Sequence, residues 1–278
     1  MSDPDYDDLL FEGLNYNSYL KIPELLGLQN RISEPPHHDE MFFIIIHQAA
    51  ELWFKEVLHE TVALSKALGG GNIYLALKVL KRLTAIMDLQ VRQINLLSTL
   101  TPHEFAGFRD KLRPASGFQS AQFREIEFTY GLRDPFFLKF FQKRPDLITR
   151  LETIQREPSV YDVFIQSLQR IGFQPPVDLT KRDFTQPHTP HVALTAFIKT
   201  IYEQSEKLSD WMLLLEAMVD FDEKFSHWRA IHILVVTRAI GSKPGTGGSA
   251  GVKFLRSRAD LKCFPDLWEA RNHIGGDY

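Results

Sequence analysis

Apolar residues recur along most of the chain at the spacing of one α-helix face, and no stretch alternates like a half-buried strand. Between residues 38 and 68 this spacing predicts a long helix with apolar positions at Phe42, Ile45, Ile46, Ala49, Trp53, Val57 and Leu64. The glycines at 69–71 predict its end, and Asn72 predicts the cap of a second helix that runs to about Leu100. Because the connection is so short, the two helices are expected to pack as an antiparallel pair.

Shorter elements follow this pair. The run "TPHE" at 101–104 combines an N-cap threonine, a proline and a glutamate, which predicts a short helix in "HEFAGFRDKL". Proline-punctuated short helices are expected over 134–172, a polar, proline-rich loop over 173–190, and two long helices over about 191–219 and 221–240. No internal repeat is visible. The sequence therefore predicts an all-α fold, a single helical-bundle domain over residues 1–278 with long antiparallel helices.

Charge and composition exclude several classes of partner. The net charge is only -3, with acidic and basic residues interspersed, so we expect neither nucleic acid nor an anionic membrane as a partner. The longest apolar run, "MFFIII" at 41–46, is too short to span a membrane, and the acidic start "MSDPDYDD" is unlike a signal peptide. We therefore expect a cytoplasmic protein. Cys263 is the only cysteine, which excludes an internal disulfide, a thiolate zinc cluster and a CxxCH haem attachment, and predicts a small buried side chain.

The stretch "IGSKPGTGGSAG" at 240–251 interrupts the helical pattern with five glycines. It fits neither common phosphate-binding motif, because no strand precedes it and no GK[ST] follows its glycines. Two interpretations stay open: an ordinary loop between helices, or a mobile loop that closes over a small polar ligand. Aromatic residues make up 12% of the chain, which suits a thick apolar core or a pocket for a flat ligand.

Two histidines, His47 and His232, lie within strongly apolar helical stretches. Burying an imidazole costs free energy unless its nitrogens find partners. A core histidine bonded to a carbonyl would satisfy this need, and so would a metal ion. Zinc or non-haem iron requires three or more protein ligands, and no HExxH motif is present. Haem needs one axial histidine because the porphyrin supplies the other four nitrogens. The residues thus permit haem without requiring it.

Three motifs carry a resemblance to a known family: "HDEMFFIIIHQAAELWFKEVLHE", "FRDKLRPASGFQSAQFREIE" and "IGSKPGTGGSAG". Together they resemble the tryptophan 2,3-dioxygenase family, and the likeness extends from "YNSYL" at 16–20 to "FPDLWEARN" at 264–272. The family is all-helical and tetrameric, and it inserts dioxygen across the indole C2–C3 bond of L-tryptophan to give N-formyl-L-kynurenine. The resemblance implies a non-covalent haem b, ferrous in the active form, with L-tryptophan and O2 as substrates and a homotetramer as the assembly.

The resemblance also implies roles for individual residues. His232 resembles the axial ligand of the haem iron, and His47 resembles the distal catalytic histidine beside dioxygen and the indole N–H. Phe43 precedes His47 by one helical turn and shares its face, so it is expected to pack against the indole. Arg109 resembles the residue that binds the substrate carboxylate through a bidentate pair. Thr246 would form a hydrogen bond with the amino-acid head group. Of the two interpretations of the glycine-rich stretch, the resemblance therefore favours a loop that closes over a ligand.

Other matching positions belong to the pocket wall. Ser116 and Gly117 lie in a segment that lines the distal pocket in the family, and Phe105, four residues before Arg109, is expected to face the same cavity. The sequence departs from the family at Leu234, where arginine is expected, and at Ser98, where relatives carry glutamate. Neither position has a role in the pocket, so these departures concern the surroundings of the haem.

The N-terminal segment, residues 1–30, is expected to complete the pocket of a neighbouring subunit, because Tyr16, Tyr19 and Leu20 resemble the residues that do so in the family. Two alternatives to the dioxygenase stay open. One is a related haem monooxygenase acting on tryptophan or another indole. The other is a haem or indole sensor without catalytic activity.

Overall fold

The computed structural model describes residues 14–246 and 251–275, and every regular element within these ranges is helical. The predicted all-α fold is confirmed. The first helices are α1 (Tyr16–Leu20), α2 (Ile22–Leu26), α3 (His38–Gly70), α4 (Ile73–Asn95), α5 (Pro102–Arg109), α6 (Ala121–Thr129) and α7 (Pro145–Arg156). They are followed by α8 (Val160–Ser167), α9 (Val177–Thr180), α10 (Val192–Glu203), α11 (Ser209–Ile240), α12 (Val252–Arg256) and α13 (Pro265–Glu269). Short 3₁₀ helices span Leu96–Thr99, Asp110–Leu112, Gly117–Gln119, Pro135–Phe141, Leu168–Ile171 and Ala270–His273.

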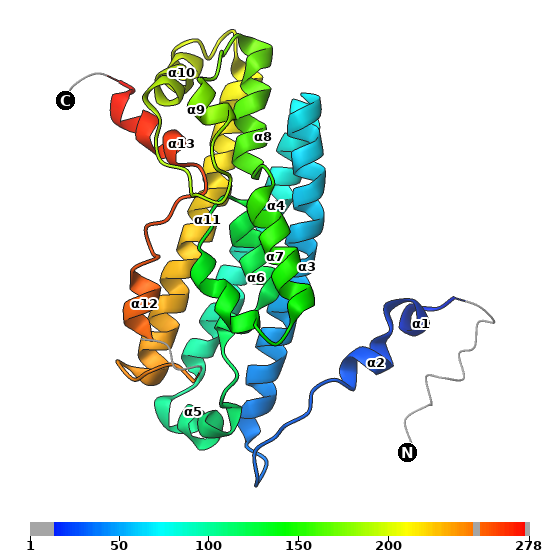
Figure 1. Cartoon of the computed structure of the whole chain (residues 1–278). Helices are drawn as coiled ribbons and strands as arrows, with labels where there is room; N and C mark the ends of the chain where they lie inside the picture. Colours follow the sequence, from blue (N-terminus) through cyan, green and yellow to red (C-terminus); the bar gives the residue numbers. More distant parts are fainter. Residues whose placement is uncertain (1–13, 247–250, 276–278) are drawn as a thin grey trace.

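Three long helices, α3, α4 and α11, lie side by side and form the body of the molecule (Figure 1). Helix α4 packs against both α3 and α11, while α6 and α8 pack on α3. The side chains between these helices are buried and apolar, and include Val57, Leu64, Leu80, Met87 and Phe225. Their burial removes one face of each helix from water, which is the main source of stability for such a bundle.

The turn between α3 and α4 follows from local chemistry. Gly71 ends α3 in the left-handed conformation, with φ +73, which glycine adopts without strain. Asn72 then caps α4, because its side-chain oxygen accepts a hydrogen bond from the Leu75 N–H at 3.0 Å. The predicted helix end, cap and pairing are confirmed. The α-helix stops at Asn95, slightly earlier than predicted, and a 3₁₀ turn carries the chain to Thr99.

The predicted boundary between the last two long helices was wrong. Helix α10 ends at Glu203, and α11 is continuous from Ser209 to Ile240, through the position where a break was expected. The chain around 220 contains neither glycine nor proline, and Val219 and Phe221 are both buried. The polar run at 203–209 has few apolar side chains to bury, so the helix is interrupted there instead.

The C-terminal part of the chain is anchored on α11 by one buried carboxylate. Asp222 accepts hydrogen bonds from the backbone N–H groups of Cys263 and Phe264 and from the indole N–H of Trp268, at 2.9 to 3.2 Å. Cys263 is buried, as predicted, and burial, together with the charge of Asp222, raises the pKa of its thiol well above the usual value. This anchor fixes the segment that follows α12.

The N-terminal segment projects away from the bundle as an arm that carries α1 and α2 (Figure 1). Glu40, in the first turn of α3, ties down the base of this arm by accepting hydrogen bonds from Ile32 N, at 2.7 Å, and from Ser33. The first 13 residues of the predicted neighbour-binding segment lie outside the described residues. Among the residues described, no helix is long and apolar enough to cross a membrane.

Candidate active site

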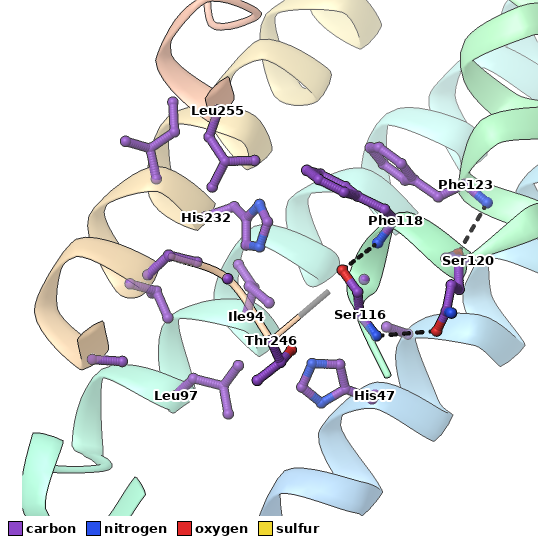
Figure 2. A pocket seen from close by; sticks show the side chains of 18 of the residues that line it. His47, Ile94, Leu97, Ser116, Phe118, Ser120, Phe123, His232, Thr246 and Leu255 are labelled. Carbon is purple, nitrogen blue, oxygen red and sulfur yellow. Dashed lines mark hydrogen bonds between the residues drawn. The ribbon is translucent and has the colours of Figure 1, made fainter. Parts of the chain in front are cut away.

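A cavity of about 590 Å³ lies between α3, α5, α6 and α11 and the segments at 115–120, 245–246 and 251–255. This volume is in the range of pockets that enclose small organic ligands. Its lining is mostly apolar and includes Ala50, Phe54, Ile94, Leu97, Leu100, Phe118, Phe123, Phe137, Trp228, Ile233, Val236, Phe254 and Leu255. The two predicted histidines also belong to this wall, with His47 projecting from α3 and His232 from α11 into the same space (Figure 2).

His47 is oriented by its own helix. Its Nδ1 lies 2.7 Å from the carbonyl oxygen of Phe43, one turn earlier. Because a carbonyl only accepts, Nδ1 must carry the proton, and Nε2 of the neutral ring is then an acceptor. Desolvation lowers the pKa of His47, although the Phe43 carbonyl and the charge of Glu51 act in the opposite direction. The ring is therefore neutral at pH 7 and presents an acceptor to a ligand.

His232 has a different setting. Its ring stacks on Trp228, one turn earlier on α11, with centroids 5.1 Å apart. Burial, with smaller contributions from His47 and Arg124, lowers the pKa of His232 to about 4. No hydrogen bond joins either ring nitrogen to another of the described residues. A neutral imidazole in an apolar wall has a lone pair suited to a metal ion.

The predicted head-group residues lie together where the glycine loop meets α5. Arg109 donates a hydrogen bond from Nη2 to the carbonyl of Pro244, and Thr246 donates from Oγ1 to the carbonyl of Ala115 at 2.6 Å. These two bonds hold the start of the loop against the cavity wall. The loop glycines at 247 and 248 lie outside the described residues.

The other predicted wall residues also reach the cavity. Phe43 packs on the His47 ring, with centroids 4.1 Å apart, and on Phe105 at 5.6 Å. Ser116 caps a 3₁₀ turn by accepting from the Phe118 N–H, and Gly117 leaves open space where a side chain would stand. The cavity therefore has an aromatic side from α3 and α5 and a small-residue side at 116–117.

Helix α5 reaches its position through an unusually close contact. A Cβ atom added at Gly107 would lie 2.6 Å from Nε2 of His37, which is closer than real Cβ contacts. The His37 ring also packs on Phe108, with centroids 5.3 Å apart. Glycine at 107 thus allows α5, with Phe105 and Arg109, to approach the start of α3.

Some sequence positions do not reach the cavity within this chain. Tyr16, Tyr19 and Leu20 lie on the projecting arm and are exposed, so they line no part of the cavity of their own chain. The two departures from the family pattern, Leu234 and Ser98, are also absent from the wall. Leu234 is exposed on α11.

Comparison with known proteins gives consistent matches. A family model described as tryptophan 2,3-dioxygenase matches residues 5–186 and 173–274. A protein of that name from Bacillus cereus is 41% identical over 263 residues, covering 95% of this chain and 94% of the relative. Its namesake from Herpetosiphon aurantiacus is 43% identical, covering 94% and 98%, and that from Caulobacter vibrioides is 39% identical, covering 95% and 99%. The chain belongs to the tryptophan 2,3-dioxygenase family.

This membership confirms the resemblance seen in the motifs. In this member of the tryptophan 2,3-dioxygenase family, the structure also places in the cavity wall residues that were not predicted from the sequence. Glu51 and Trp228 line the cavity one turn from His47 and His232 respectively, so helical spacing alone was a usable signal for both. Arg124 and Glu127 also line it and form a buried ion pair. At three residues apart, such a pair is indistinguishable in sequence from an exposed one.

Proposed function

We propose that this chain is a haem-dependent tryptophan 2,3-dioxygenase, which adds both atoms of O2 across the C2–C3 bond of L-tryptophan to give N-formyl-L-kynurenine. The observation that carries the proposal is one cavity that combines two neutral histidines with a cation and a hydroxyl at the glycine loop. Family membership supports the same reaction.

The residues around His232 fit haem as the cofactor. The described residues contain no group of three or more histidine, cysteine or acidic side chains that could hold a metal by themselves. A porphyrin supplies four ligands and requires one more, which the unpartnered imidazole of His232 would provide. Since Cys263 is the only cysteine, the haem would be non-covalent haem b. When bound in its ferrous state, haem supplies the activation of O2 that a closed-shell indole needs.

His47 would orient the indole. Its Nδ1 is engaged by the Phe43 carbonyl, so the acceptor at Nε2 faces the cavity and suits the indole N–H. Phe43 would pack against the indole ring from the same helix face. We assign His47 to positioning, because indole can react at C2 or C3 without first losing its N–H proton. The apolar wall excludes water from the reacting atoms.

Arg109 and Thr246 would bind the head group of tryptophan. Arg109 uses one N–H on the Pro244 carbonyl, and its other donors have no partner among the described residues. A planar guanidinium can offer two parallel hydrogen bonds to a carboxylate. Thr246 would exchange its bond to the Ala115 carbonyl for the amino-acid head group. Fixing both charged groups of the head group would select the L-enantiomer.

We further propose that the chain acts as one catalytic domain within a homotetramer in which the arm completes a neighbour's pocket. Tyr16 and Tyr19 are 73% and 69% exposed, and an arm of apolar side chains is favourable only when something covers it. The double variant Tyr16→Ala/Tyr19→Ala should keep its haem and lose affinity for tryptophan. A fully active monomer in light scattering would contradict this assembly.

Product mass is the decisive test of the function. Protein loaded with haem and reduced should convert L-tryptophan under ¹⁸O2 into a product carrying two labelled oxygen atoms. One labelled atom would indicate a monooxygenase, and binding without turnover would indicate a sensor. The His232→Ala variant is the matched control, because it should lose the haem spectrum while keeping the helical fold.

A further inference from the structure

Three arginines meet two carboxylates where α6 and α11 face the cavity. Arg124 and Arg229 both reach Glu127, at 2.5 Å and 3.4 Å. Arg258 pairs with Asp134 at 2.7 Å. The three arginines and Glu127 all belong to the cavity wall. The group therefore has three positive charges against two negative ones, so one cation lacks a counter-charge.

The positive charge of Arg124 is largely buried, away from water. Arg124 is 6% exposed, and its guanidinium carbon lies 4.0 Å from the ring centroid of Phe137 and 4.6 Å from that of Phe123. Its Nε is buried and has no hydrogen-bond partner among the described residues. Desolvation, partly offset by Glu127, lowers the pKa of Arg124 to about 10, so the group is still charged at neutral pH.

A buried cation without a full counter-charge is costly, and an anion that enters with the cavity's ligand would remove this cost. Arg124 is better placed for it than Arg229, whose Nη1 is already bonded to the carbonyl of Leu261 at 3.0 Å. Among the described residues, the Arg124 side chain donates a hydrogen bond only to Glu127. Phe123 and Phe137, which both line the cavity beside Arg124, would contact a flat, apolar ligand with an acidic edge.

We propose that Arg124 binds a carboxylate of the flat ligand that fills the cavity. The inference rests on the proposed function, in which two molecules carry such a group: haem has propionates and tryptophan has its α-carboxylate. Arg109 lies at the glycine loop, on α5, and already offers the tryptophan carboxylate a partner there. The carboxylate that Arg124 binds is therefore a propionate at the edge of the porphyrin.

Binding of haemin and of haemin dimethyl ester to the haem-free protein tests this directly. The two probes share the same porphyrin and iron, and in the ester two methyl groups remove the negative charge of the propionates. Wild-type protein should bind the free acid about ten- to a hundredfold more tightly in absorbance titrations. Arg124→Gln should remove most of this preference, and Arg124→Lys should retain part of it because the charge persists.

A second titration separates the two sources of carboxylate. In haem-loaded protein, Arg124→Gln should leave the preference for tryptophan over tryptamine unchanged in calorimetry. If that preference falls instead, the carboxylate site stands and tryptophan is its occupant. If Arg124→Gln changes neither preference, the proposal is overturned.

The control variant is Arg150→Gln. Arg150, on α7, pairs at 2.6 Å with the buried Glu125, which lies on α6 next to Arg124, and neither Arg150 nor Glu125 lines the cavity. Its loss disturbs a buried carboxylate without altering the charge of the cavity, so the acid-to-ester preference should stay as in wild type. Equal affinity of the wild type for both haemins would refute the inference even if Arg124 variants fail to fold. Failure to bind haemin at all would refute the proposed function as well.

Discussion

Gly107→Ala would displace α5 from the start of α3. The added Cβ would lie 2.6 Å from Nε2 of His37 and 2.7 Å from its Cδ2, where ordinary contacts are 3.4 to 4 Å. The His37 ring has little freedom to move aside, because it packs on Phe108 and its Nδ1 accepts from the Asp39 N–H at 3.3 Å. The helix and the ring must therefore separate by about 1 Å.

This displacement would act on the proposed substrate site through Phe105 and Arg109, which α5 carries into the cavity wall. Misplacing a positioning group by 1 Å costs on the order of a hundredfold in rate. We expect Gly107→Ala to lower kcat/KM for L-tryptophan by roughly ten- to a hundredfold, with a loss of about 1 to 3 kcal/mol in unfolding free energy. Haem content should be unchanged, since His232 stands on α11.

Steady-state kinetics of product formation provides the assay, and a second substitution provides the internal check. The double variant Gly107→Ala/His37→Ala removes the ring that the new methyl group meets, so it should recover most of the lost kcat/KM. Gly69→Ala is the control, because its Cβ would meet nothing closer than Val163 at 3.7 Å. Wild-type kinetics in Gly107→Ala, or no recovery in the double variant, would refute the reasoning.

Three other substitutions probe separate parts of the molecule. Although burial opposes it, hydrogen bonds from His188 and Ser159 lower the pKa of Asp162 to about 2, from 3.8. Asp162→Asn should therefore cost about 2 kcal/mol in urea unfolding at pH 7. The folded pKa is the lower one, so this cost should vanish as pH falls from about 4 to 2. Asp222→Ala leaves buried N–H donors unpaired, and should cost about 3 kcal/mol or more and open Cys263 to thiol reagents. Arg109→Ala should reduce kcat/KM about a hundredfold or more for tryptophan and much less for tryptamine.

Much of the fold was predictable because its helix ends are encoded locally. Gly71, Asn72 and Thr101 each satisfy backbone groups within a few residues of themselves, so their roles can be seen in sequence. The boundary between α10 and α11 was not predictable in this way. No glycine or proline marks this boundary. Polar residues occur both near 220 and at 203–209, and which of the two stretches stays helical depends on which one the rest of the bundle buries.

In the candidate site, too, some residues could be predicted from local sequence and others could not. His47 and His232 were detectable because a polar ring in an apolar stretch conflicts with its surroundings. Arg124 and Glu127 were not, since an arginine and a glutamate three residues apart read as a solvated pair. Only the packing of Phe123 and Phe137 around the guanidinium reveals that the pair is buried. Burial of a charge is a property of the tertiary fold.

The two histidines of the cavity differ in one hydrogen bond, and the roles proposed for them follow from that difference. Desolvation in the same cavity keeps both rings neutral, so charge alone does not distinguish them. Nδ1 of His47 is fixed by the Phe43 carbonyl, which turns Nε2 into an oriented acceptor for a ligand N–H. The His232 ring stacks on Trp228, and neither of its nitrogens is hydrogen-bonded to another of the described residues, which leaves a lone pair for a metal. We propose that the oriented acceptor of His47 on α3 contacts the substrate, while His232 on α11 offers its lone pair to the haem iron.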